Sequence, residues 1–254
     1  SIPVLLDYCE KIKRLAHPNC LIFNFTNPSG IVTQALNSCG YPVYGICDAP
    51  SEFIKQLAAM LNVAEDRFAC ECFGLNHLSW FTHFQVDGQD VTERIFNDPQ
   101  LFSKTEMRLF EPQVLKMTDG CLPNEYLYFY YYTRKVIASS TQAKESRAQL
   151  IERVNAQMNQ ALEGVDPDQE FEKAFRIFFK HYNIRENNYM MNESGKVRVR
   201  HYDVPGVEEF LTAPDEGGYA GVALRFVRAW SQNEPVEMIL SIPNRGAIPG
   251  LRDE

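Results

Sequence analysis

Four side chains with metal-binding or acid–base chemistry stand in short polar motifs in the first third of the chain. They are Asn27 in Asn-Pro-Ser-Gly, Cys47 and Asp48 in Cys-Asp-Ala-Pro, and His77 at the end of Gly-Leu-Asn-His. A thiolate and an imidazole are ligands for divalent metal ions, and a carboxylate can transfer protons. The Asn27 and Cys47–Asp48 motifs are each as typical of a turn or helix start as of a site, because Asn, Asp and Pro favour those positions. A lone histidine such as His77 is more often structural than a ligand. Spacing along the chain does not establish that Cys47 and His77 meet in space.

An aromatic segment supplies a fifth candidate. Residues 122–132 contain five tyrosines, and Tyr126 is the first of them. Most side chains of such a segment are expected to pack between domains. A tyrosine near a metal ion and a cationic group can lose its proton and act as a base.

The elements around these motifs are predicted to form a parallel α/β sheet. Two helix–strand pairs are expected over residues 5–26 and 31–47, followed by a helix over 50–61. Strands that are apolar rather than alternating are typical of parallel sheets covered by helices. Ligands bind beyond the carboxyl ends of such strands, so Asn27 and Cys47 stand where a site is expected.

The rest of the chain predicts an α+β arrangement. We expect two strands at 68–73 and 78–86, then mostly helical structure over 91–181. The expected elements after that are a polar, tyrosine-rich loop or hairpin over 183–204, a helix over 217–230 and a strand near 236–242.

Composition restricts the classes of function. The 254 residues carry 25 Lys and Arg against 33 Asp and Glu, a formal net charge of −8. So acidic a chain offers no broad basic face to a phosphate backbone, and nucleic acid is not an expected partner. No apolar run approaches the ~18 residues of a membrane span, so no membrane is expected either. Seven cysteines without disulfide-framework spacing favour reduced thiols, and we expect a cytoplasmic protein.

The motifs, taken in their order, resemble one enzyme family. Asn-Phe-Thr-Asn-Pro-Ser-Gly, Gly-Ile-Cys-Asp-Ala-Pro, Phe-Gly-Leu-Asn-His and Leu-Pro-Asn-Glu-Tyr-Leu follow one another, and Ile-Pro-Asn-Arg-Gly stands near the end. This combination resembles glycoside hydrolase family 4, which contains NAD- and manganese-dependent 6-phospho-glucosidases, and is closest to its 6-phospho-β-glucosidases. The resemblance implies an α/β fold: a partial Rossmann-like parallel sheet, its first half missing, and an α+β C-terminal domain as in the lactate/malate dehydrogenase superfamily. It also implies NAD and Mn2+, or another divalent metal, as cofactors.

The resemblance further implies a redox-elimination mechanism, an exception to hydrolysis by two carboxylates. NAD+ oxidises the C3 hydroxyl of the sugar, a base removes the C2 proton, and the aglycone leaves from C1; water then adds and C3 is reduced again. The metal ion acts as a Lewis acid on the C2 and C3 oxygens. The expected substrate is a phosphorylated disaccharide of the cellobiose-6-phosphate type, and the expected assembly is a homodimer or homotetramer.

The functional residues of the family match residues of the motifs. Cys47 and His77 match the metal ligands, and Tyr126 matches the catalytic base. Asp48 stands where the α-specific branch has its proposed proton donor, which makes it a second catalytic candidate. Asn27 matches an asparagine that contacts the substrate.

Two further expectations concern substrate and cofactor. Arg147 lies about where the family has a substrate-binding arginine, and a helix-surface ion pair is the alternative for it. No G-x-G-x-x-G occurs and the chain opens on a helix, so the cofactor-binding motif is expected before residue 1. Residues 1–66 are then the second half of an NAD-binding Rossmann-like domain. Residues 67–254 are an α+β substrate, metal and oligomerisation domain, truncated at its C-terminus.

Three alternatives stay open. Asp48 is more typical of 6-phospho-α-glucosidases, because the β branch has Asn after the cysteine. A plain dehydrogenase of the lactate/malate type also has Asn-Pro after the equivalent strand. The third alternative is a catalytically inactive sugar-phosphate binding protein.

Overall fold

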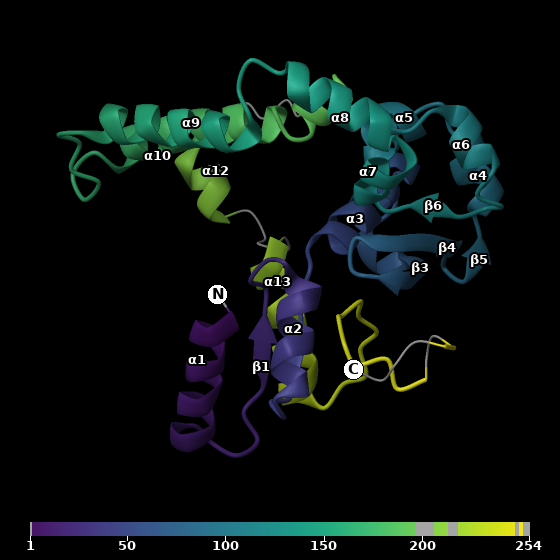
Figure 1. Ribbon diagram of the computed structural model, residues 1–254, viewed down its shortest axis with the longest axis horizontal. Helices are drawn as coiled ribbons and strands as arrows, with labels where there is room; N and C mark the ends of the chain where they lie inside the picture. The colour runs from purple at the N-terminus through teal and green to yellow at the C-terminus, as the bar shows by residue number, and fades with distance from the viewer. Residues whose placement is uncertain (1, 197–205, 213–217, 247–248, 251–254) are drawn as a thin grey trace. The chain divides into compact units, whose positions relative to one another are not determined.

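The computed structural model describes residues 2–196, 206–212, 218–246 and 249–250 (Figure 1). The chain divides into two compact units, the first made of Ser1–Leu127 with Glu216–Glu254 and the second of Tyr128–Asp215. The candidate residues Asn27, Cys47, Asp48, His77 and Tyr126 all belong to the first unit.

The first unit begins with the predicted parallel α/β sheet. Its elements in order are α1 (Ile2–Leu15), β1 (Ile22–Asn24), α2 (Ser29–Ser38), β2 (Val43–Gly45) and α3 (Ala49–Leu61). Strands β1 and β2 pair in parallel, with Ile22 opposite Val43 and Asn24 opposite Gly45. The helix–strand alternation and the parallel pairing are therefore confirmed.

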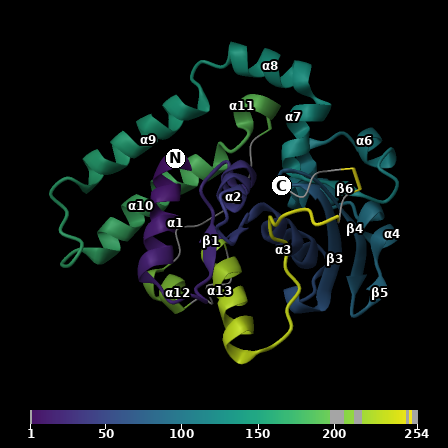
Figure 2. The same ribbon diagram turned by 60° about the horizontal axis from the view of Figure 1, so that its bottom comes forward.

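Apolar residues at helical spacing explain why α1 and α2 cover this sheet. Cys9 of α1 is buried with Val32 and Leu36 of α2 and Val43 of β2, in one apolar cluster. From the other end of the chain, α13 (Gly218–Gln232) packs against the same two strands (Figure 1 and Figure 2). The ring of Phe226 lies 4.9 Å from that of Phe23.

A small antiparallel sheet follows in the same unit. After η1 (Glu65–Arg67) come β3 (Phe68–Leu75), β4 (Leu78–Val86), β5 (Gln89–Asp90) and, later in the chain, β6 (Leu122–Pro123). The two predicted strands over 68–73 and 78–86 are confirmed. Strands β3 and β4 pair up to Leu75 and Leu78, so only Asn76 and His77 form the turn between them.

Short helices connect this sheet to the rest of the unit. They are α4 (Thr92–Asn97), α5 (Leu101–Lys104), η2 (Glu106–Leu109), α6 (Pro112–Lys116) and η3 (Glu125–Leu127). Ile95, Leu101 and Met107 are fully buried and form part of the apolar core beneath them. The mostly helical structure expected over 91–181 is confirmed here and in the second unit.

The second unit is helical where the structure describes it. Its elements are α7 (Tyr128–Tyr131), α8 (Thr133–Gln142), α9 (Arg147–Leu162), α10 (Phe171–Asn187), α11 (Met191–Ser194) and α12 (Val207–Thr212). The loop or hairpin expected over 183–204 is wrong for residues 183–194, where α10 continues and α11 follows. Side chains bond to the carbonyls of the added turn, because Asn188 Nδ2 donates to Ile184 at 2.7 Å and Arg147 Nη1 donates to Arg185 at 2.8 Å. Residues 197–204 lie outside the described part of the chain.

The strand expected near 236–242 is also wrong. The segment makes a single bridge, in which the backbone groups of Gly45 and Ser241 exchange two hydrogen bonds of 2.9 Å. Pro243 has no N–H to continue such a ladder, and Pro235 precedes the segment. The helix predicted before it, over 217–230, is confirmed as α13.

Gly74 lets β3 and β4 come close together just before the turn that carries His77. Its φ is +119°, and a Cβ there would meet the backbone of Leu78 and the Cα of Ser79 at 2.8 Å. Gly88, in the next turn, also has a positive φ of +77° but has open space around it.

Gly74→Ala is expected to lower the free energy of unfolding by about 3 kcal/mol, because conformational strain is added to a backbone clash. Gly88→Ala carries the strain alone and should cost about 1 kcal/mol. Urea unfolding of the two variants checks this order. Equal losses would contradict the role of close packing at Gly74.

Candidate active site

Buried hydrogen bonds join the end of β1 to α2 and to the end of β2. The amide of Asn24 donates to Thr33 Oγ1 at 3.0 Å, and the hydroxyl of Ser29 donates to the carbonyl of Ile46 at 3.2 Å. The Ile46 N–H donates to the carbonyl of Asn24 at 2.8 Å. Asn27 in one loop and Cys47 in the other therefore lie at the same edge of the parallel sheet.

Cys47 and His77 are brought together from positions thirty residues apart. Sγ of Cys47 lies 3.2 Å from Nε2 of His77. His77 occupies the β3–β4 turn with a φ of +63°, in the left-handed region that histidine adopts more readily than most residues. The turn thus presents the imidazole to the end of β2.

The distance between these two groups fits their joint binding of one metal ion. Nitrogen and sulfur ligands roughly 2.1 Å and 2.3 Å from an ion, at a right angle to each other, would be about 3.1 Å apart. Within the described residues, no group of three or more His, Cys, Asp and Glu side chains gathers around an ion position. Two protein ligands leave coordination positions open for another ligand, which suits the Cys47–His77 pair to an exchangeable ion.

Burial keeps both partners neutral in the absence of a metal ion. Desolvation raises the pKa of the Cys47 thiol to about 11, and the nearby Asp48, Glu125 and Cys72 add to the rise. Desolvation lowers the pKa of His77, which favours the neutral imidazole that binds metal ions. A metal ion that binds here must displace the thiol proton, so its affinity should increase with pH.

The Cys47 thiol is expected to react slowly with iodoacetamide at pH 8 when no metal is present. A thiol with a pKa of about 11 is only about 0.1% thiolate at that pH, and the thiolate is the reactive form. Its alkylation rate should rise about tenfold for each added pH unit up to pH 10. Mass spectrometry of alkylated peptides measures this, with the exposed Cys39 as the internal control. Equal rates for the two residues at pH 8 would contradict the expectation.

Tyr126 lies against the metal-binding candidate His77. The two rings are stacked, with centroids 3.9 Å apart and planes within 12° of parallel. Tyr126 is held in η3, because its N–H donates to the buried side chain of Asn124 at 3.0 Å. The Asn124 N–H in turn donates to the carbonyl of Ser79 on β4. The phenol is thereby fixed to the same sheet that carries the imidazole.

A residue that the sequence analysis missed completes this arrangement. Tyr219, at the start of α13, stacks its ring on that of Phe25, with centroids 5.4 Å apart, and its hydroxyl lies near enough to Asn27 and Asp48 for both to affect its pKa. Burial raises the pKa of its hydroxyl above the ordinary value, and the Asp48 carboxylate adds to the rise. Only its position in the final predicted helix was visible in the sequence, because no motif surrounds it.

Arg147 belongs to the second unit. It is the first residue of α9, directly after a capping box formed by Ser146 and Gln149. Its Nη1 donates to the carbonyl of Arg185 at 2.8 Å, and burial together with the Arg185 charge lowers its pKa. Its assignment to the substrate stays a prediction.

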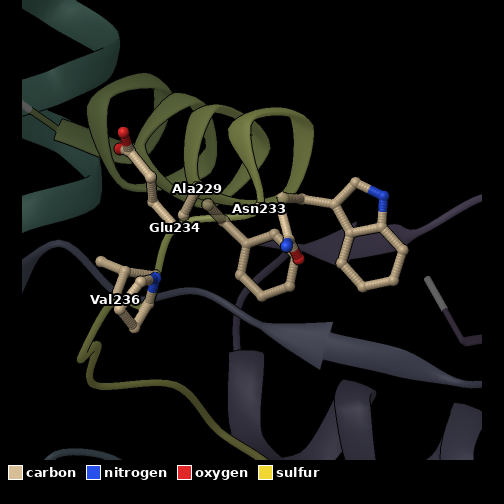
Figure 3. Close-up of a pocket in the computed structure, with 7 residues that line it drawn as sticks. Ala229, Asn233, Glu234 and Val236 are labelled. Atoms are coloured by element: carbon tan, nitrogen blue, oxygen red, sulfur yellow. The ribbon is translucent and has the colours of Figure 1, made fainter.

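A cavity of about 640 Å³ in the first unit does not coincide with these residues (Figure 3). It is lined by the end of α13 and the segment after it, from Phe226 to Val236. None of the candidate residues lines this cavity, so the site is defined by the side chains at the strand ends.

The fold and the site define a class: a dehydrogenase-like α/β protein with a Cys–His pair and tyrosines at the ends of its parallel strands. The sequence profile of family 4 glycosyl hydrolases matches residues 1–63, and the profile of their C-terminal domain matches residues 72–254. The chain belongs to family 4 of the glycosyl hydrolases.

Relatives with both anomeric preferences are similar to this chain. Phospho-alpha-glucosidase PagL of Clostridium acetobutylicum is 31% identical over 158 residues, which are 54% of this chain and 34% of the relative. The 6-phospho-beta-glucosidase BglT of Thermotoga maritima is 34% identical over 103 residues, which are 40% of this chain and 24% of the relative.

The fold is that of a solved 6-phospho-beta glucosidase from Thermotoga maritima with manganese, NAD+ and glucose-6-phosphate. The TM-score is 0.64 at 22% identity, over 99% of this chain and 50% of the solved one. The chain thus spans half the length of that structure. Among the residues that the structure describes, no helix has the length and apolarity needed to cross a bilayer.

Proposed function

We propose that the protein is an NAD- and divalent-metal-dependent glycosidase that hydrolyses 6-phospho-β-glucosides of the cellobiose-6-phosphate type. The observation that carries this proposal is the contact of Cys47 with His77 at 3.2 Å, with Tyr126 stacked on the imidazole. It is supported by the family membership and by the manganese, NAD+ and glucose-6-phosphate bound in the solved relative.

Cys47 and His77 would hold the metal ion, which is Mn2+ by analogy with that relative. When bound, the ion supplies Lewis-acid polarisation of sugar oxygens and NAD+ supplies hydride transfer at C3. The two protein ligands leave room for substrate oxygens beside the pair.

Three residues of the first unit would handle the substrate and its protons. Tyr126 takes the proton from C2 of the sugar. Asp48 gives a proton to the leaving oxygen at C1, because its carboxyl group belongs to the same strand-end loop as Cys47. Asn27 donates a hydrogen bond to a sugar hydroxyl, and Arg147 is a proposed substrate-binding residue.

The proposal includes the organisation of the whole protein. Residues 1–66 would form the second half of an NAD-binding domain, and 67–254 an α+β domain for substrate, metal and oligomerisation. The proposed state is a cytoplasmic homodimer or homotetramer without nucleic-acid or membrane partners.

A 6-phospho-α-glucosidase is the second candidate function. Asp48 favours it, because an aspartate after the cysteine is more typical of the α-specific enzymes that the sequence resembles. The phospho-alpha-glucosidase among the similar proteins is consistent with this candidate.

The test uses the protein expressed from its natural reading frame, with NAD+ and Mn2+ under reducing conditions. Release of nitrophenol is followed from the α- and β-nitrophenyl glucoside 6-phosphates, with and without chelator. Chelator-sensitive release from the β substrate supports the proposal. Release from the α substrate alone would instead support the 6-phospho-α-glucosidase. Glucose 6-phosphate binding without any release indicates an inactive binding protein. Net NADH accumulation with a 2-hydroxy acid would instead indicate a plain dehydrogenase.

A further inference from the structure

The buried hydroxyl of Ser29 connects the motif that contains Asn27 to the motif that contains Cys47. Ser29 is the first residue of α2 and is 2% exposed. We propose that Ser29 is a positioning residue, whose hydroxyl fixes the backbone before Cys47 and thereby the distance from the Cys47 thiol to His77. Its consequence for metal binding rests on the proposed function, whereas the hydrogen bonds of Ser29 are those of the structure itself.

The Ser29 hydroxyl reaches backbone carbonyls at the ends of both parallel strands. Its Oγ lies 3.2 Å from the carbonyl oxygen of Ile46 and 3.5 Å from that of Asn24. A hydroxyl has one proton to donate, so the shorter contact, to Ile46, is the principal hydrogen bond. Asn24 is the last residue of β1, and Ile46 directly follows β2. One side chain of α2 therefore joins the two strand ends.

The backbone just before Cys47 is held on every side. Gly45 exchanges two hydrogen bonds of 2.9 Å with Ser241, and the Ile46 N–H donates to the carbonyl of Asn24 at 2.8 Å. These partners are all backbone groups, whereas the Ile46 carbonyl is held by the Ser29 side chain. That carbonyl shares one planar peptide group with the nitrogen of Cys47. The Ser29 hydroxyl thus acts on the last peptide plane before the thiol-bearing residue.

Removal of this hydroxyl leaves a buried carbonyl without its donor. Ile46 is 0% exposed, so water does not readily replace the lost hydrogen bond. A buried polar group that loses its partner favours rearrangement toward a new one. In Ser29→Ala the Ile46–Cys47 peptide is therefore expected to rotate, and the Cys47 side chain moves with it.

Asn37 provides a matched control on the same helix. Its Nδ2 donates to the carbonyls of Thr33 and Val43, both at 2.9 Å. Like Ser29, it joins α2 to a backbone carbonyl of the β2 segment through a side-chain donor. Val43, however, is the first residue of β2, at the end of the strand away from Cys47. Asn37→Ala therefore weakens the packing of α2 on β2 without releasing the peptide before Cys47.

Ser29→Ala is expected to weaken the binding of Mn2+ about tenfold, the lower end of the range for residues that orient metal ligands. Asn37→Ala should change it less than about twofold, because the lost bonds are remote from the ligand pair. Electron paramagnetic resonance of free Mn2+ measures the affinity, and thermal unfolding defines a temperature at which both variants are folded. An unchanged affinity in Ser29→Ala, or an equal loss in both variants, would overturn the proposal.

Crystal structures of the two variants test the same role without a metal ion. In Ser29→Ala the distance from Cys47 Sγ to His77 Nε2 should increase from 3.2 Å, and in Asn37→Ala it should not. An Ile46–Cys47 peptide and a thiol–imidazole distance that are unchanged in Ser29→Ala would overturn the proposal. Failure of the unmodified protein to bind Mn2+ would instead count against the proposed function.

Discussion

Loss of either member of the Cys47–His77 pair is expected to abolish metal-dependent turnover. Cys47→Ala and His77→Ala each leave one ligand, and the affinity for Mn2+ should fall at least about 100-fold, because outer-shell changes alone cost up to that much. Titration of free Mn2+ by electron paramagnetic resonance measures the affinity directly. The nitrophenol assay measures turnover in the same samples.

The control for this prediction lies on the same hairpin. His77 has a φ of +63° and His83 a φ of +53°, so both positions carry the same backbone constraint. Asparagine tolerates this conformation, which makes His77→Asn and His83→Asn a matched pair. Only His77→Asn should lose the metal ion, because His83 is exposed and pairs with Glu71. Undiminished Mn2+ affinity in His77→Asn would remove the main support for the proposed function.

Tyr126→Phe is expected to lower kcat by about 10²- to 10⁴-fold, the range for loss of a general base. Phenylalanine keeps the stack on the His77 ring, so metal affinity and KM should stay within about threefold of the unmodified protein. Steady-state kinetics with the preferred nitrophenyl glucoside 6-phosphate give both constants.

Isotope substitution tests the step that Tyr126 is assigned to. With substrate deuterated at C2, the primary isotope effect on kcat should be larger in Tyr126→Phe than in the unmodified protein, because proton removal becomes slower than every other step. Tyr130→Phe, at a tyrosine that is 64% exposed, serves as the control and should show normal kcat. An unchanged isotope effect combined with a reduced kcat would assign Tyr126 to another step.

Turn residues and apolar spacing were sufficient to predict most helices and strands of the first unit. Apolar strands ended by Asn-Pro and Asp-Ala-Pro motifs predicted β1, β2 and the helices after them, since the turn residues and apolar spacing agree. The strands on either side of Gly74-Leu-Asn-His were predicted from their apolar residues in the same way. Two expectations failed where contacts beyond the local pattern decided. Hydrogen bonds from Arg147 and Asn188 support the last turn of α10 in the expected loop, and prolines reduced the expected last strand to one bridge.

The sequence by itself determined which chemistry was available and at which ends of which strands. The order of the motifs resembles that of the family, and this resemblance singled out the candidates Cys47, His77 and Tyr126. It could not place them relative to one another, since contacts between distant segments depend on how helices and strands pack. Tertiary structure alone brought Cys47 to 3.2 Å from His77 and stacked Tyr126 on the imidazole. It also brought Tyr219 onto Phe25 from a helix that no motif marks, because the apolar face of α13 packs on the sheet and thereby determines where the first turn lies.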